Sequence, residues 1–148
     1  MSHAVASPVV TIAVGQMCSG PDRAKNLASA SSLAELAVKK QAKMLFLPEN
    51  FHFMGDSSKH SLSIAEPLTG PAMASYAKLA RDSGLWLSLG GFQERSETPD
   101  THLHNTHVIL NPNGDIVQFY RKIHMFDYAT LREVRPPQSQ SQLAKRTT

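Results

Sequence analysis

Two short apolar runs, separated by a helical pattern, constrain the start of the fold most strongly. Residues 9–17 (VVTIAVGQM) are rich in β-branched side chains and apolar on both sides at their centre, as in a strand buried inside a layered fold. Residues 44–48 (MLFLP) form a second strand-like run, which Pro48 ends because proline has no N–H to donate. Apolar residues three and four positions apart predict a helix over 22–42. A crossover of this length makes the two strands parallel neighbours.

The following segment continues the alternation of strands and helices. Gly70-Pro71 opens a second predicted helix, and Gly84 is placed to end it. Asn113-Gly114 is typical of a hairpin turn. A strand–helix–strand unit followed by a hairpin predicts an α/β fold with a mixed sheet. The further expected strands are 85–91, 105–111 and 115–122, and the expected loops are 50–63 and 93–101.

The texture of the sequence changes after Asp127. Beyond Tyr128 there is no aromatic residue, and the segment consists largely of Arg, Gln, Ser, Pro and Thr. Such a composition argues against a packed element. We therefore predict a flexible N-terminus over 1–8, a folded part over 9–127 and a divergent, disordered tail over 128–148.

Composition excludes several classes of function. The net charge of the 148 residues is only +3, and Lys and Arg are mostly interleaved with Asp and Glu, so we expect no nucleic-acid partner. The single cysteine, Cys18, rules out a disulfide within the chain and suits a reducing compartment. No run approaches the ~18 apolar residues of a membrane span, and the start lacks a signal sequence. We expect a soluble cytoplasmic protein, with a mitochondrial form as the alternative.

Three residues are candidates for chemistry. Glu49 directly follows the second strand, and ligands bind at the carboxyl ends of parallel strands, so it could act as a general base. Lys122 ends the last strand and could stabilise an oxyanion or anchor a carboxylate. Judged by local spacing alone, a solvated glutamate and an edge-strand cation are the better interpretations. Cys18 has no base nearby in the sequence, which favours a structural thiol.

Four histidines in the second half of the chain raise the question of a zinc site. His102, His104 and His107 form an H-x-H-x-x-H run, with His124 further on, and alternate strand positions share one face. No neighbouring cysteine or carboxylate completes a recognisable ligand set. We therefore expect no metal and no cofactor, and keep a histidine-based metal module as the least favoured alternative.

Taken together, these motifs resemble the carbon–nitrogen hydrolase (nitrilase) superfamily. Residues 47–50 (LPEN) look like its first catalytic motif, and residues 120–127 (YRKIHMFD) look like its lysine motif. Residues 85–95 (LWLSLGGFQER) are most similar to its deaminated glutathione amidase branch. Further matches in the same order are Gly15-Gln16-Met17, Gly70-Pro71 and Asn105-Thr106.

The resemblance implies an α-β-β-α sandwich, here truncated, that hydrolyses small ω-amides such as deaminated glutathione. It implies a Glu–Lys–Cys triad, in which Glu49 is the general base and Lys122 stabilises the tetrahedral intermediate. It also implies a small-molecule amide substrate and assembly into a homo-oligomer.

The sequence departs from the family at the nucleophile. The family's catalytic cysteine lies beyond the lysine motif, whereas no cysteine follows Cys18 here, and Cys18 does not match that position. The second glutamate of the family would also lie downstream, and Glu133 in the tail is no substitute. We expect the resemblance to end at Asp127 and the chain to be inactive as written. The alternative is a non-catalytic partner or regulatory subunit that pairs with a full-length homologue.

Overall fold

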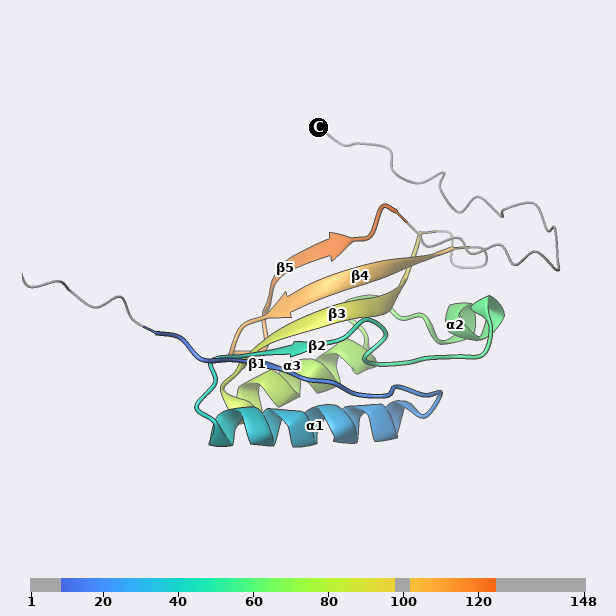
Figure 1. The fold of residues 1–148 in the computed structure, drawn as a ribbon. Helices are drawn as coiled ribbons and strands as arrows, with labels where there is room; N and C mark the ends of the chain where they lie inside the picture. Colours follow the sequence, from blue (N-terminus) through green and yellow to red (C-terminus); the bar gives the residue numbers. More distant parts are fainter. Residues whose placement is uncertain (1–8, 98–101, 125–148) are drawn as a thin grey trace, which may run out of the picture.

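The computed structural model describes residues 9–97 and 102–124. Within them it contains one five-stranded sheet, in the order β1-β2-β3-β4-β5 (Figure 1). β1 with β2 and β2 with β3 are parallel, whereas β3 with β4 and β4 with β5 are antiparallel. The predicted mixed sheet is therefore confirmed. The strands are β1 (Ile12–Val14), β2 (Met44–Leu47), β3 (Trp86–Arg95), β4 (Leu103–Leu110) and β5 (Ile116–Arg121), and the helices are α1 (Arg23–Lys39), α2 (Ser58–Ile64) and α3 (Pro71–Ser83).

Local chemistry sets the ends of the two long helices as the sequence predicts. The Asp22 carboxylate accepts hydrogen bonds from the first backbone N–H groups of α1, which have no partner inside the helix. Pro71 occupies the first turn of α3, where its missing N–H costs nothing. Gly84 ends α3 in the left-handed conformation at φ 66°, which glycine adopts without a steric penalty. None of the described helices is long and apolar enough to span a membrane.

Helices α1 and α3 cover one face of the sheet, and the core lies between them and the strands (Figure 1). Alanines form the buried stripe of α1, so the helix backbone can approach the sheet closely. Each fully buried leucine stabilises the fold by about 1.5–3 kcal/mol. The buried residues on the strands are Leu45, Leu47, Leu87, Leu89, Phe92, Val108 and Leu110.

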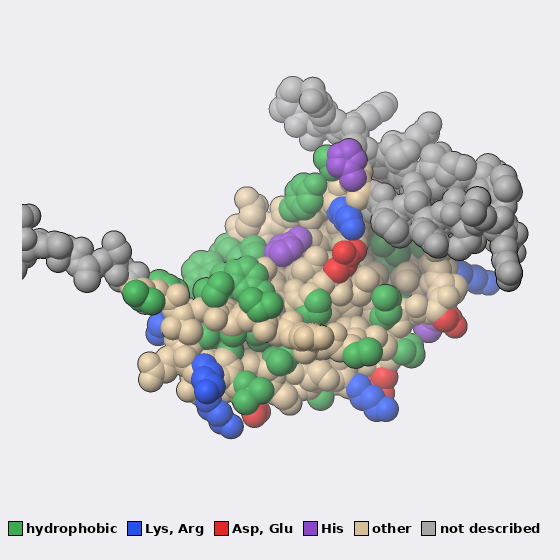
Figure 2. Space-filling view, viewed as in Figure 1, with side chains coloured by type: hydrophobic (Ala, Val, Ile, Leu, Met, Phe, Trp, Pro, Cys, Tyr) green, Lys and Arg blue, Asp and Glu red, His purple; other side chains and the backbone are tan. Residues whose placement is uncertain are grey.

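The opposite face of the sheet carries apolar side chains that helices α1 and α3 do not cover. Strand register places Ile12, Met44 and Trp86 beside one another on this face, with Val14 and Phe46 in the next row. Val14 is 81% exposed and Trp86 40% exposed. Figure 2 shows hydrophobic side chains gathered over the strands. We call this surface the open face; it also includes Ile109 and Tyr120.

The open face corrects one prediction about the first strand. We expected 9–17 to be a strand buried on both faces, but β1 has only three residues, and Ile12 and Val14 are exposed. β1 is an edge strand with a helix layer on one side, so only its inward residue, Ala13, packs against the core.

Two predicted loops contain regular structure. The segment 50–63 includes most of α2, whose N-cap Ser57 accepts a hydrogen bond from the N–H of His60. The segment 93–101 begins inside β3, which runs on to Arg95. β3 continues because its register with β4 resumes after an irregularity between Leu89 and Phe92. The expected hairpin between β4 and β5 is confirmed, with Gly114 at φ 80°.

Candidate active site

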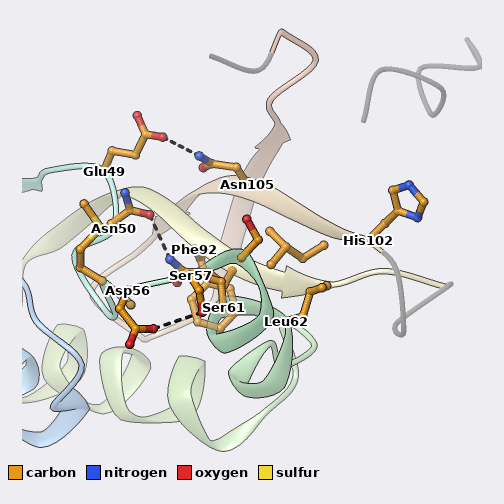
Figure 3. A pocket seen from close by; sticks show the side chains of 14 residues that line it. Glu49, Asn50, Asp56, Ser57, Ser61, Leu62, Phe92, His102 and Asn105 are labelled. Carbon is orange, nitrogen blue, oxygen red and sulfur yellow. Dashed lines mark hydrogen bonds between the residues drawn. The ribbon is translucent and has the colours of Figure 1, made fainter. Parts of the chain in front are cut away.

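Glu49 lies just beyond β2, at the carboxyl end of the parallel strands. Its Oε1 accepts a hydrogen bond from Asn105 Nδ2 at 2.6 Å, drawn in Figure 3. The same oxygen lies 3.4 Å from Lys122 Nζ. The structure thus brings together both catalytic residues that the resemblance implies, although they are 73 positions apart in the sequence.

A bulge in β3 makes room for this contact. A Cβ on Gly91 would lie 2.7 Å from Asn105 Oδ1 and 2.9 Å from Glu49 Cγ. A Cβ on Gly90 would lie 2.6 Å from the backbone oxygen of Leu47. Both glycines are therefore required by close approach of neighbouring chain segments, and they let Glu49 lie against β3 and β4.

Asn105 links the two charged residues. Its amide donates to Glu49, and its backbone carbonyl accepts a hydrogen bond from the N–H of Lys122 at 2.8 Å. The Lys122 side chain is 37% exposed and that of Glu49 is 50% exposed. Water screens a pair with this exposure, so its direct contribution to stability is at most about 1 kcal/mol. We therefore examine the pair of Glu49 and Lys122 for its role in a reaction rather than for its contribution to stability.

Glu49 and Asn105 line a pocket of about 370 Å³ (Figure 3). Asn50 and Gln93 form a polar side of the pocket and are joined by a hydrogen bond of 2.9 Å. The start of α2 contributes hydroxyl groups, and β3 contributes the ring of Phe92. This size is at the lower end for a pocket that holds a small organic ligand. The other lining residues are Met54, Gly55, Asp56, Ser57, Ser58, Ser61, Leu62, His102 and Leu103.

An ion pair between the buried carboxylate of Glu94 and the half-exposed Arg121 was not predicted from the sequence. Arg121 donates to both carboxylate oxygens of Glu94, at 2.8 and 2.6 Å, and Thr106 Oγ1 donates to Oε2 at 2.6 Å. Burial opposes ionisation of Glu94, but the hydrogen bonds from Arg121 and Thr106 outweigh it and lower the pKa of the Glu94 carboxyl. The hydrogen bond to Glu94 likewise raises the pKa of Arg121. Because Arg121 is held in this way on β5, it fixes the end of the strand from which Lys122 extends.

Of the remaining candidates, only His102 lines this pocket among the residues that the structure describes. Cys18 is exposed and does not line it. His107 Nε2 lies 2.9 Å from Ser88 Oγ, and His104 lies opposite Glu94 on the neighbouring strand. In the parts of the chain that the structure describes, no three His, Cys, Asp or Glu side chains are grouped closely enough to hold a metal ion.

Comparisons with known proteins place this geometry in a family. The sequence model described as carbon-nitrogen hydrolase matches residues 11–147. The match continues past Asp127, where we expected the resemblance to end; residues 125–148 lie outside the described part of the structure. Over 125 residues the chain is 46% identical to the nitrilase and fragile histidine triad fusion protein NitFhit of Drosophila melanogaster, covering 84% of this chain and 26% of that protein.

Two further relatives support the same family. Human deaminated glutathione amidase is 41% identical over 118 residues, which are 78% of this chain and 36% of that enzyme. The crystal structure of Caenorhabditis elegans NitFhit superimposes with a TM-score of 0.76 at 36% identity, covering 88% of this chain and 32% of that one. The chain therefore spans between about a quarter and a little over a third of the length of these relatives. By its sequence and its fold, it belongs to the carbon–nitrogen hydrolase family of the nitrilase superfamily.

Proposed function

We propose that this chain carries the glutamate and lysine of an amidase site for small ω-amides, of the kind that its deaminated glutathione amidase relatives are named for. The contact of Glu49 with both Asn105 and Lys122 at the edge of a pocket is the observation that supports the proposal most directly.

The chemistry assigns a role to each side chain. Glu49 takes the proton of a cysteine thiol, and the sulfur attacks the amide carbon. Lys122 donates a hydrogen bond to the oxygen that gains negative charge. The carbon–nitrogen bond then breaks, ammonia leaves with the proton that Glu49 held, and water hydrolyses the thioester to the acid. Asn105 holds the Glu49 carboxylate so that one oxygen stays near Lys122.

The thiol for this reaction is not available from Cys18, the one cysteine among the 148 residues, because its exposed side chain lies outside the pocket. We therefore expect the purified 148-residue chain to release no ammonia from the ω-amide of deaminated glutathione. Human deaminated glutathione amidase is the positive control. Turnover by the chain that Glu49→Ala abolishes would contradict the proposed absence of a nucleophile.

A chimera separates the roles of Glu49 and Lys122 from the question of the nucleophile. Residues 1–124 of this chain replace the matching segment of human deaminated glutathione amidase, which supplies its own downstream sequence. Lys122→Met in this chimera should lower kcat about 10²–10³-fold, as expected for a lost oxyanion donor. Glu49→Gln should lower it about 10²–10⁴-fold, as expected for a lost general base. Lys59→Met, on α2 and away from the contact, is the matched control. Full activity of Glu49→Gln would refute the assignment.

The open face supports a second candidate function, that of a non-catalytic partner of a full-length homologue. Contiguous apolar side chains such as Val14 and Trp86 mark surfaces that bind other proteins. Co-expression with a full-length relative should give a complex that light scattering detects and that Val14→Asp weakens. Leu36→Asp, which changes an exposed leucine of α1, is the control. A monomer that does not bind the relative would contradict this role.

A further inference from the structure

A second cluster of polar groups lies behind the candidate active site, around His52. The backbone carbonyl of His52 accepts a hydrogen bond from Asn26 Nδ2 at 2.8 Å, which ties this position to α1. The imidazole ring packs edge-on against Tyr76, with 5.8 Å between ring centroids, and lies 5.6 Å from the ring of Phe92. His52 is only 5% exposed and Tyr76 is fully buried. The imidazole is therefore enclosed by aromatic side chains rather than by water.

The polar atoms of these two side chains lack partners. Among the described residues, neither ring nitrogen of His52 nor the hydroxyl of Tyr76 has a hydrogen bond. Buried polar groups in folded proteins nearly always have one, because leaving them unpaired loses the hydrogen bonds they made to water. Three such atoms lie on two side chains that contact each other, which indicates that a bound molecule supplies their hydrogen-bond partners.

Both residues line a pocket of about 230 Å³ between the first turns of α1 and α3. None of its lining residues is shared with the pocket at Glu49. Arg23 and Glu66 also line it and form an ion pair of 2.8 Å, so their charges cancel. Glu66 is further held by the N–H of Ala72 at the start of α3, at 2.9 Å. The pocket is thus built from residues that other contacts fix in place.

The chemistry of the unpaired atoms defines the ligand. Burial, helped by the charge of Arg23 and opposed by Glu66, lowers the pKa of His52 to about 4, so the ring is neutral at neutral pH. A neutral imidazole offers one donor and one acceptor, and the Tyr76 hydroxyl also offers both. A carboxylate would supply acceptors only, whereas a primary carboxamide both donates and accepts.

We propose that the pocket between α1 and α3 binds a small neutral molecule through a primary carboxamide that pairs with His52 and Tyr76. The three polar atoms are closed off from bulk water, so none of them has a water partner that the ligand must first displace. The pocket is smaller than those that hold drug-sized ligands, which limits the occupant to a few non-hydrogen atoms. The proposal is independent of the amidase site, since no residue that lines this pocket also lines the pocket at Glu49.

The test uses propionamide as the probe and the ring ¹⁵N signals of His52 as the readout. In the 148-residue chain, propionamide should shift these signals saturably, and propionate should not. Tyr76→Phe keeps the ring that fills the core and removes one partner, so it should weaken propionamide binding at least about tenfold. His52→Phe, followed by thermal shift, gives the same test if Tyr76→Phe does not fold. Glu49→Gln should leave the shifts of the His52 signals unchanged.

Three results would overturn the proposal. The first is the absence of a saturable shift up to about 100 mM propionamide, which would mean that water alone occupies the pocket. The second is binding that Tyr76→Phe and His52→Phe leave intact. The third is a shift that Glu49→Gln abolishes, which would place the amide in the other pocket. A failure of the chimera to hydrolyse amides would contradict the proposed amidase site but would not bear on these three measurements of binding at His52.

Discussion

His52 should make the stability of the chain depend on pH over a defined range. The pKa of His52 is about 4 in the folded chain and about 6.5, its ordinary value, in the unfolded chain. Below pH ~6.5 the unfolded chain binds a proton that the folded chain does not take up until about pH 4. The free energy of unfolding should therefore fall as the pH is lowered between these values, and the contribution of His52 should be constant below them. At about 1.4 kcal/mol per pH unit, the expected total loss is about 3 kcal/mol.

Urea unfolding of the wild type and His52→Phe at a series of pH values isolates this effect. The wild type should lose about 3 kcal/mol more than the variant between about pH 7 and pH 4. Glu94 acts at lower pH, because the stability it contributes is lost as the pH falls from the ordinary pKa of 4.5 through the lowered pKa in the folded chain. His124→Phe is the matched control, since water surrounds this exposed side chain in the folded chain. Parallel curves for the wild type and His52→Phe would refute the argument that burial keeps the imidazole neutral.

The contacts near the site give three further predictions, each measured as a change in the free energy of urea unfolding. Gly91→Ala should cost about 1–3 kcal/mol because its methyl group would overlap Asn105 and Glu49, whereas Gly20→Ala, with no atom within 4 Å of the new methyl, should change stability by less than about 0.5 kcal/mol. Glu94→Gln should cost about 2 kcal/mol by weakening charged hydrogen bonds, while Lys78→Gln, which breaks an exposed ion pair, should cost less than about 0.5 kcal/mol. Asp22→Ala should cost about 1 kcal/mol by removing the cap of α1. Equal changes in stability for a variant and its control would contradict the predictions for Gly91 and Glu94. An unchanged stability of Asp22→Ala would contradict the prediction for the cap of α1.

Local signals predicted that Glu49 and Lys122 stand at strand ends, but only the family resemblance predicted that they belong to one site. Pro48 ends the second strand, so Glu49 must stand at its carboxyl end, and the Asn113-Gly114 turn sets where β5 runs. When the strands follow the order of the sequence, the carboxyl ends of β2 and β5 lie at the same end of the sheet. The strand ends need only a residue and its near neighbours, whereas the strand order depends on pairing between distant segments.

The unpredicted features depend on contacts between distant segments. The link through Asn105 requires the bulge at Gly90-Gly91, and two adjacent glycines inside a strand pattern were the only sign of it. Glu94 looked like part of a polar loop, yet Arg121 and Thr106 keep it buried within β3. α2 was missed because its sequence has no apolar period, and the isolated position of His52 gave no hint of a pocket.

The candidate site and the open face are two aspects of one arrangement. Asn105, His107 and Ile109 occupy every second position of β4 and therefore share one face of the sheet, so the side chain of Asn105 lies on the open face. A hydrogen bond to a developing oxyanion is strong only where water is excluded, whereas Glu49 and Lys122 are half exposed. A layer packed on the open face would therefore also exclude water from the Asn105 side of the site and strengthen the contact between Glu49 and Lys122. The catalysis that we propose for Glu49 and Lys122 thus requires both a thiol and a covering layer, and a second polypeptide segment that packs on the open face would supply the two together.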